Sequence, residues 1–224
     1  MSSALRVELE SLLRHRKLDR TLTTNACADV ARDVMPTGLE RLDGQLGGGV
    51  ARGHLSEIVG PRSSGRTTVL CRMFRAAADR GEAMAFIDTC DRFDPASAAA
   101  SGVDLSKLLW VRERGDASRA LKAMNLVLQA GGFGLVAFDI ADVSPMALRQ
   151  FPYTTWMRIA RVIEGSQTAA VVIAAERIAR SPGGVTIALE PLPDVSRAQW
   201  SGTADRARFL RGIELRTRVV GGMR

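Results

Sequence analysis

Short runs of apolar residues alternate with amphipathic segments along most of the chain. The runs "HLSEIVG", "AMAFID", "KLLWVR", "FGLVAFD" and "AAVVIAAE" hold few polar positions, as expected for strands that are buried on both faces. Segments with helical spacing separate them, at residues 67–80, 95–102, 116–132 and 146–166. Pro152 lies inside the last segment and must kink or restart that helix. This alternation predicts an α/β fold with a mostly parallel, twisted sheet flanked by helices.

The N-terminal part of the chain has a different pattern. A stripe of leucines predicts one amphipathic helix, which we expect to dock on its own domain, on a neighbouring subunit or on a partner: Leu5, Leu9, Leu12 and Leu13. Residues 19–38 lack a clear period and contain Pro36 and Gly38, so we interpret them as a linker or a loosely packed segment. The expected organisation is a helix and linker over residues 1–35 and a core over residues 36–224.

The C-terminal part reads as strands without a long helix between them. Residues 183–192 and 211–220 have strand-like patterns, which predicts an antiparallel extension of the sheet. Seven arginines lie between residues 197 and 224, so this basic tail could contact DNA or a protein partner, or could simply present a solvated face. Trp200 and Phe209 could anchor such a partner or pack on the core.

Length, cysteine content and charge indicate the class of protein and its expected location. Its 224 residues fit one full-sized domain, and no apolar run approaches the roughly 18 residues that suggest a membrane span. Cys27, Cys71 and Cys90 lie far apart and only two histidines are present, so neither a zinc site nor a disulfide framework is supported. We expect a cytoplasmic protein with free thiols and no membrane contact. The net charge of +7 favours polyanionic partners, although an arginine-rich genome gives the same bias.

One loop has the spacing of a phosphate-binding loop. In "VGPRSSGRTTVL" the pattern G-x-x-x-x-G-K-[ST] recurs with arginine in place of lysine, after a predicted strand and before a predicted helix. Backbone N–H groups and the helix N-terminus would surround the phosphates of ATP, and the Thr67 hydroxyl would bind magnesium. A plain glycine turn is the alternative. The candidate nucleotide-binding residues in this loop are Gly60, Pro61, Arg62, Ser63, Ser64, Gly65, Arg66, Thr67 and Thr68.

A second half of such a site follows the run "LVAFD". This predicted strand ends in Asp139, which is placed to coordinate magnesium through water. Strands that end in aspartate are common, so this pattern indicates a magnesium site only in combination with the glycine loop. Together the two segments make Thr67 and Asp139 the candidate metal ligands.

Two longer stretches resemble a known family. "PTGLERLDGQLGGGVARGHLSEIVGPRSSGRTTVL" and "AFIDTCDRFDPASAAASGVDLSKLLWV" resemble the core of the bacterial recombinase RecA. The chain also looks like the RecA-related ImuA proteins, which accompany a Y-family-like polymerase homologue and an error-prone polymerase in the damage-inducible mutasome. The likeness covers residues 36–189. It implies a RecA-like P-loop core with ATP and magnesium as cofactors, and it implies single-stranded DNA, RecA and the polymerase homologue as partners.

Several residues depart from the RecA pattern. Arg66 takes the place of lysine, and a planar guanidinium is not equivalent to a compact ammonium at a phosphate site. RecA's water-positioning glutamate aligns with Cys90, and a neutral thiol is a poor substitute for a carboxylate. Asp91 could compensate only if its side chain reaches the water. RecA's adenine-stacking tyrosine aligns with Ser97, while Asp94 keeps the acid of the Asp-Pro pair and is a further candidate nucleotide-binding residue. We therefore assign no catalytic residue and expect hydrolysis to be lost and nucleotide affinity weakened.

A second RecA-like region concerns DNA. RecA binds single-stranded DNA partly through a loop before a Gly-Gly pair, and the matching residues here are Arg177, Arg180, Gly183 and Gly184. Arginines beside glycines could hold a backbone phosphate, with a solvated loop as the alternative. Glu176 lies near the position of RecA's phosphate-sensing glutamine, and an acid there disfavours phosphate.

These observations lead to competing hypotheses. The first is a non-hydrolysing accessory protein of translesion synthesis in the DNA damage (SOS) response, which binds the polymerase homologue or RecA. Because the equivalent RecA helix packs on the neighbouring core, the N-terminal helix would bind RecA or mediate self-association. The second is a DNA-dependent ATPase of recombinational repair, with Arg66 and Asp91 replacing lysine and glutamate. The third is a basic DNA-coating protein, whose binding would depend steeply on salt.

Overall fold

A seven-stranded, mostly parallel sheet forms the centre of the protein. The computed structural model describes residues 33–179, 181–190, 198–201, 209–213 and 215–220. The strands of the sheet are β3 (Leu55–Val59), β4 (Met84–Asp88), β5 (Leu108–Arg112), β6 (Leu135–Asp139), β7 (Ala169–Ala174), β8 (Thr186–Leu189) and β11 (Thr217–Val220). Their order is β11-β8-β3-β7-β6-β4-β5, with β11 alone antiparallel to its neighbour. The predicted fold class is confirmed.

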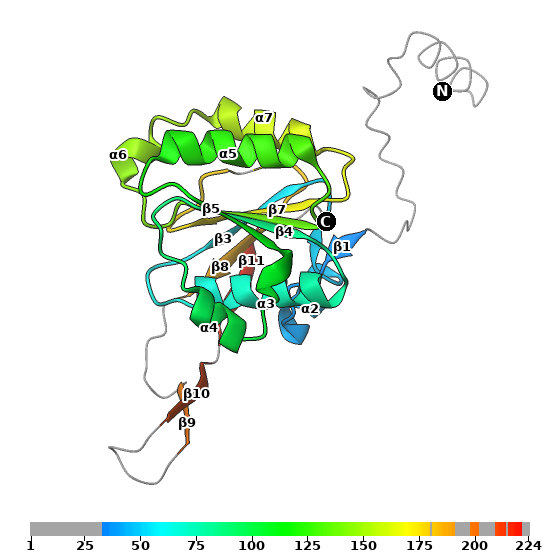
Figure 1. Cartoon of the computed structure of the whole chain (residues 1–224), viewed down its shortest axis with the longest axis vertical. Coiled ribbons are helices and arrows are strands. Elements are labelled where there is room, and N and C mark those ends of the chain that lie inside the picture. The colour runs from blue at the N-terminus through cyan, green and yellow to red at the C-terminus, as the bar shows by residue number, and fades with distance from the viewer. Residues whose placement is uncertain (1–32, 180, 191–197, 202–208, 214, 221–224) are drawn as a thin grey trace, which may run out of the picture. The chain divides into compact units, whose positions relative to one another are not determined.

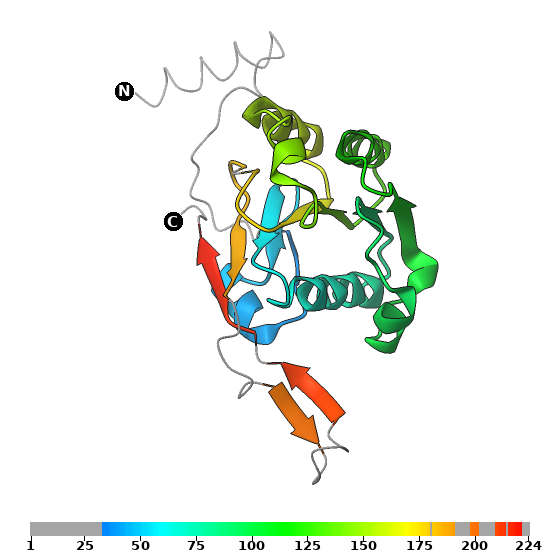
Figure 2. The same ribbon diagram turned by 90° about the vertical axis from the view of Figure 1, so that its left-hand side faces the viewer.

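Helices cover both faces of this sheet. They are α2 (Glu40–Leu46), α3 (Arg66–Asp79), α4 (Pro95–Ala100), α5 (Ala117–Ala130), α6 (Pro145–Leu148) and α7 (Tyr153–Ile163), with a short 3-10 turn at Leu105–Lys107. The helices α5, α6 and α7 lie on one face, and α2, α3 and α4 lie on the other (Figure 1 and Figure 2). In the described part of the chain, no helix has the length and apolar character needed to cross a bilayer.

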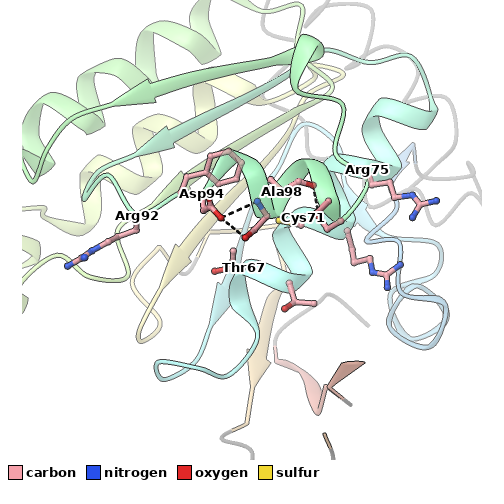
Figure 3. A pocket seen from close by; sticks show the side chains of 12 residues that line it. Thr67, Cys71, Arg75, Arg92, Asp94 and Ala98 are labelled. Atoms are coloured by element: carbon pink, nitrogen blue, oxygen red, sulfur yellow. Dashed lines mark hydrogen bonds between the residues drawn. The ribbon is translucent and has the colours of Figure 1, made fainter. Parts of the chain in front are cut away.

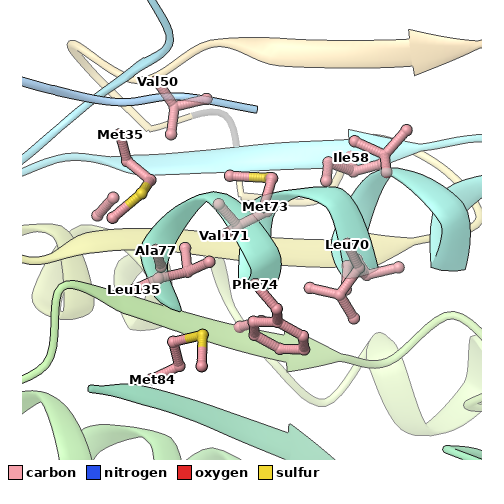
Figure 4. Close-up of a cluster of buried hydrophobic side chains, with 14 of the residues drawn as sticks. Met35, Val50, Ile58, Leu70, Met73, Phe74, Ala77, Met84, Leu135 and Val171 are labelled. Carbon is pink, nitrogen blue, oxygen red and sulfur yellow. The ribbon is translucent and has the colours of Figure 1, made fainter. Parts of the chain in front are cut away.

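Apolar side chains fill the two spaces between the sheet and the helices. Every residue of β3, β4 and β7 is buried, as their nearly continuous apolar runs predict. On the α3 side, Met73 and Phe74 of the helix pack against the sheet with Met84 and Leu135 (Figure 4). The rings of Phe74 and Phe86 meet edge to face, with centroids 5.7 Å apart. These contacts fix α3, whose first turn borders the glycine loop.

Local polar signals set the helix boundaries. The Asp116 carboxylate accepts a hydrogen bond from the Arg119 N–H at 3.0 Å and begins α5, as its position in the sequence predicts. Pro152 stands at the N-cap of α7 and separates this helix from α6. The proline therefore restarts the helix, which is one of the two outcomes expected for it.

The segment expected to be a linker contains a strand instead. β1 (Val34–Met35) pairs antiparallel with β2 (Val50–Ala51), and the Met35 side chain is completely buried. The prediction of a loosely packed segment is therefore wrong for these residues, because a two-residue strand is too short to show a period. The predicted N-terminal helix lies outside the described residues.

The C-terminal strands confirm only part of the predicted extension. β11 pairs antiparallel with β8, as predicted, but β8 itself runs parallel to β3 and belongs to the main sheet. Between them, β9 (Ala198–Ser201) and β10 (Phe209–Ile213) pair as a separate antiparallel ribbon. The residues just before β11 return to the main sheet, where the Glu190 N–H donates to the Arg216 carbonyl at 3.1 Å.

A buried carboxyl group connects β3 to its surroundings. Glu57 is 1% exposed and lies three residues before the glycine loop. Its Oε1 accepts hydrogen bonds from the Ile178 N–H at 2.8 Å and the Ala179 N–H at 2.6 Å, and its Oε2 accepts one from the Thr186 hydroxyl at 3.0 Å. The strand that leads into the glycine loop is thereby fixed to the segment between β7 and β8.

Removing this carboxyl group should destabilise the fold. In Glu57→Ala, three donors lose their acceptor, and unpaired buried donors cost on the order of 3 kcal/mol or more together. Urea unfolding should therefore show a clearly lower free energy of unfolding, with Glu57→Gln intermediate because one acceptor oxygen remains. The exposed Glu164→Ala is the matched control and should change stability little. Equal stability of Glu57→Ala and this control would contradict the role given to Glu57.

Candidate functional site

The glycine loop joins the end of β3 to the start of α3. Ser63 and Gly65 have positive φ angles of 60° and 97°, so the loop turns sharply before the helix. A Cβ atom on Gly60 would lie 2.6 Å from the Ser64 hydroxyl oxygen and 2.8 Å from the Leu189 carbonyl oxygen. Glycine is therefore required at Gly60 for close approach, which agrees with the spacing recognised in the sequence.

Polar groups around this loop are available to a ligand. Gly65 caps α3 without a side-chain hydrogen bond, so the N–H groups of the first turn have no side-chain acceptor at the cap. Thr67 and Thr68 are exposed there. The Ser64 hydroxyl is buried and has no hydrogen-bond partner among the described residues. A 14-residue helix with its first turn free and a buried hydroxyl beside it fits an anion such as a phosphate.

The side chain of Leu215, near the C-terminus, packs against the glycine loop. The Cδ2 atom of Leu215 lies 2.2 Å from the position that a Cβ atom on Gly65 would take, so the leucine packs directly on the glycine. Leu215 also joins the apolar cluster between α3 and the sheet. No pattern in the sequence indicated this contact, because 150 residues separate the two positions (215 minus 65).

Arg66, the first residue of α3, turns its side chain back onto the sheet. Its Nη1 donates to the Gly60 carbonyl at 2.9 Å and to the Ala174 carbonyl at 3.2 Å. These carbonyls mark the ends of β3 and β7, and the guanidinium is half-buried between them. Two hydrogen bonds to the backbone therefore hold the Arg66 side chain against the ends of β3 and β7.

Asp139 ends β6 beside this arginine. Arg66, Thr67 and Asp139 line one cavity of about 90 Å³, so the structure brings together the two candidate metal ligands and the loop arginine. Burial raises the pKa of Asp139 to about 6, against the lowering effects of the Ala141 N–H and of the Arg66 charge. Burial disfavours the charged carboxylate, so Asp139 keeps its proton to a higher pH than an exposed aspartate does.

The residues after β4 are a thiol and a carboxylate in different surroundings. Cys90 is half-buried, and burial together with the nearby carboxylates raises the pKa of its thiol. Asp91 has a φ of 56°, and Arg112 holds its carboxylate through two bonds of 2.6 and 2.8 Å. Hydrogen bonding to Arg112 lowers the pKa of Asp91. Because Arg112 lies on the edge strand β5, Asp91 is directed toward that edge and not toward the glycine loop.

The buried Asp88 explains the shape of this segment. Its carboxylate accepts hydrogen bonds from the Arg92 N–H at 3.0 Å, the Phe93 N–H at 2.9 Å and the Trp110 indole N–H at 3.3 Å. The turn that contains Cys90 and Asp91 is therefore fixed by the last residue of β4. The sequence shows an acid at a strand end here, but not which way the following side chains point.

A larger pocket lies between α3 and α4 (Figure 3). Its volume is about 610 Å³, within the usual range for small-molecule sites. Asp94 caps α4 at its rim and accepts hydrogen bonds from the Ala96 N–H, the Ser97 N–H and the Ser97 hydroxyl, which lower its pKa. Three arginines line the same pocket and were not singled out from the sequence: Arg72, Arg75 and Arg92.

The region between β7 and β8 has a packing role in the structure. A Cβ atom on Gly183 would lie 2.4 Å from the His54 Nδ1 atom, and one on Gly184 would lie 1.9 Å from the Leu55 carbonyl oxygen. The two glycines therefore allow this segment to approach β3. Arg177 is exposed, and Arg180 lies outside the described residues. Contact with DNA at these positions stays a prediction.

Comparisons with known proteins agree with this geometry. A family model described as the RecA N-terminal domain matches residues 18–149. Protein RecA of Methylococcus capsulatus is 38% identical over 117 residues, which is 51% of this chain and 33% of that protein. Protein RecA of Nitratidesulfovibrio vulgaris is 36% identical over 146 residues, which is 64% of this chain and 41% of that protein. The matched part of the chain thus spans about a third of the first relative and about two fifths of the second.

The fold has a counterpart among solved structures. The crystal structure of the RadB recombinase superposes with a TM-score of 0.55 and 19% sequence identity. The match covers 72% of this chain and 85% of that chain. At 19% sequence identity, the superposition shows a shared fold, that is, the same arrangement of the sheet and its helices.

The raised pKa of Asp139 predicts a pH-dependent effect of removing its charge. An acid whose pKa is higher in the folded state destabilises the fold increasingly as the pH rises from about 4, where the unfolded chain ionises, to about 6, and the penalty is complete above that pH. Asp139→Asn should therefore raise the melting temperature at about pH 8, and the gain should shrink toward about pH 4. Thermal unfolding at both pH values checks this, with the exposed Asp79→Asn as control. A gain that is equal at both pH values would contradict the assigned cause.

Proposed function

Since this chain belongs to the RecA N-terminal domain family, we propose that it is a RecA-like accessory protein of the DNA damage response that holds a nucleotide without hydrolysing it. Its role would be the promotion of translesion synthesis, as the resemblance to ImuA proteins implies. The first part of the proposal rests on the site itself, and the second rests on the sequence resemblance.

The arrangement after β4 is the observation that supports a non-hydrolysing site. A general base for the attacking water needs a carboxylate or another group with a suitable pKa within reach of the phosphate. Cys90 stands at the aligned position with a raised pKa, so its thiol stays protonated at neutral pH. The neighbouring carboxylate of Asp91 is engaged by Arg112 at the edge of the sheet. These two features support a site in which no general base activates water at the glycine loop.

The glycine loop supports retention of the nucleotide. The turn at Gly65, the free first turn of α3 and the buried Ser64 hydroxyl are all features that a phosphate group would use. The pocket between α3 and α4 continues from Thr67 and Thr68 toward Asp94 and offers room for the rest of a nucleotide. ATP is the proposed ligand because the family binds it.

The proposed partners follow from the resemblance and from charge. They are the Y-family-like polymerase homologue, RecA itself and, through the net charge of +7, single-stranded DNA. The N-terminal helix is the element proposed to bind RecA or to mediate self-association. Residues 33–224 form a compact unit of their own, so this helix can be tested separately from the core.

Nucleotide binding and turnover can be separated in one preparation. Titration with a fluorescent ATP analogue should show saturable binding, while phosphate release should stay at the background level of Asp139→Ala with and without single-stranded DNA. DNA-stimulated release that disappears in Asp139→Ala would contradict the proposal and favour a DNA-dependent ATPase, for which the shared cavity of Thr67 and Asp139 is the supporting observation. Absence of binding would show that the loop no longer holds a nucleotide.

Deletion of the N-terminal segment tests the proposed partner contact. A chain that begins at Asp33 should unfold at nearly the same temperature as the full chain, because the compact unit begins there. It should no longer bind RecA or self-associate, as measured by biolayer interferometry and by light scattering. Substitution of Leu9 by Asp in the full chain is the smaller matched change and should weaken the same binding. Unchanged binding of the shortened chain would contradict the role of this helix.

A further inference from the structure

An arginine of the glycine loop is paired with an aspartate from a different loop. Asp142 lies in the loop between β6 and α6, three residues after Asp139. Its Oδ1 accepts hydrogen bonds from the Arg62 Nε at 3.1 Å and from the Arg62 Nη2 at 3.0 Å. Its Oδ2 lies 3.6 Å from the Nε of Arg92, which belongs to the segment between β4 and α4. One carboxylate thus joins two arginines that come from two different segments.

The two arginines stand beside the space proposed for the phosphates. Arg62 lies two positions before Ser64, whose buried hydroxyl has no hydrogen-bond partner among the described residues. Arg92 and Thr67 line both the cavity of about 90 Å³ beside Asp139 and the larger pocket between α3 and α4. Arg92 therefore stands where the phosphate end of the site meets the pocket proposed for the rest of the nucleotide.

Both guanidinium groups are directed to Asp142. Arg62 uses two adjacent donors of its fork, Nε and Nη2, on this one carboxylate. In Figure 3 the Arg92 side chain points away from the other labelled side chains of the larger pocket. In this arrangement the positive charge of both arginines is paired with an acid of the protein itself.

This pairing is weak enough for a phosphate group to replace it. The Arg62 and Arg92 side chains are 77% and 69% exposed, and ion pairs of exposed side chains contribute little free energy. The same guanidinium donors match the oxygens of a phosphate as well as those of a carboxylate. Because the phosphates of a nucleotide carry more negative charge than one aspartate, they attract the two arginines more strongly.

We propose that Asp142 competes with the phosphates of a bound nucleotide for Arg62 and Arg92. Both arginines turn from the aspartate to the ligand when it binds, and Asp142 thereby lowers the affinity of the site. The inference rests on the nucleotide-binding part of the proposed function, and it adds Arg92 and Asp142 to the residues that determine affinity. Neither residue was singled out from the sequence.

Binding of a fluorescent ATP analogue in excess MgCl₂ tests this inference. Full-length wild type is compared with Asp142→Asn, with the double variant Arg62→Gln/Arg92→Gln, and with the triple variant that combines these changes. Asp142→Asn should bind about fivefold more tightly than wild type, because the arginines no longer have to leave a carboxylate. In the background without the two arginines, the same substitution should change the dissociation constant by less than about twofold.

Asp104→Asn is the matched control. Its carboxylate also lies near a basic side chain, the Lys107 Nζ at 3.9 Å. Asp104 precedes β5, however, and so lies at the opposite end of the parallel strands from the glycine loop. Binding by this variant should equal that of wild type. Circular dichroism of each variant confirms that it is folded before its affinity is compared.

The outcomes separate this inference from the proposed function. Wild-type binding that Asp142→Asn leaves unchanged or weakens overturns the inference and leaves the nucleotide-holding function standing. An equal gain with and without the two arginines also overturns it, because the carboxylate would then act by repelling the phosphates directly. Absence of binding by both wild type and Asp142→Asn overturns the nucleotide site itself, and this inference with it. Binding by Asp142→Asn alone supports the inference, since the aspartate then keeps the arginines from the ligand in wild type.

Discussion

The hydrogen bonds of the buried Glu57 carboxyl group fix the part of the molecule on which the site depends. β3 lies in the middle of the sheet and leads directly into the glycine loop. A strand in this position must be rigid, because the loop's N–H groups can converge on a ligand only if both of its ends are fixed. Glu57 provides this rigidity on one side of the strand, and the packing of Met73 and Phe74 provides it at the helix. Two glycines then allow the segment after β7 to approach closely enough for the carboxyl group to reach it.

Arginine side chains engage several carboxylate and carbonyl groups around this site. Arg66 donates to backbone carbonyls, Arg112 pairs with Asp91, and Arg62 and Arg92 share Asp142. Each contact pairs a guanidinium group with an acidic or carbonyl group of the protein itself. The site therefore keeps the shape of a phosphate loop while its charges satisfy one another.

The sequence predicts those features that depend on neighbouring positions. Buried strands appear as apolar runs, the cap of α5 appears as Asp116, and the glycine loop appears through its spacing. The remaining features arise from residues that are far apart in the chain. β1 is too short to show a period, and the direction of Asp91 depends on Arg112, 21 positions away. Resemblance to RecA supplied the identity of the missing glutamate, but only coordinates show what surrounds the thiol that replaces it.

The contact between Leu215 and Gly65 couples the last strand to the glycine loop. Leu215 follows the β9–β10 ribbon and precedes β11, so its place over the loop is maintained by the pairing of β11 with β8. Because Leu215 occupies the space beside Gly65, a shift of this glycine also requires a shift of the leucine. The position of β11 at the edge of the sheet and the geometry of the glycine loop are therefore linked, although the two segments lie at opposite ends of the described chain.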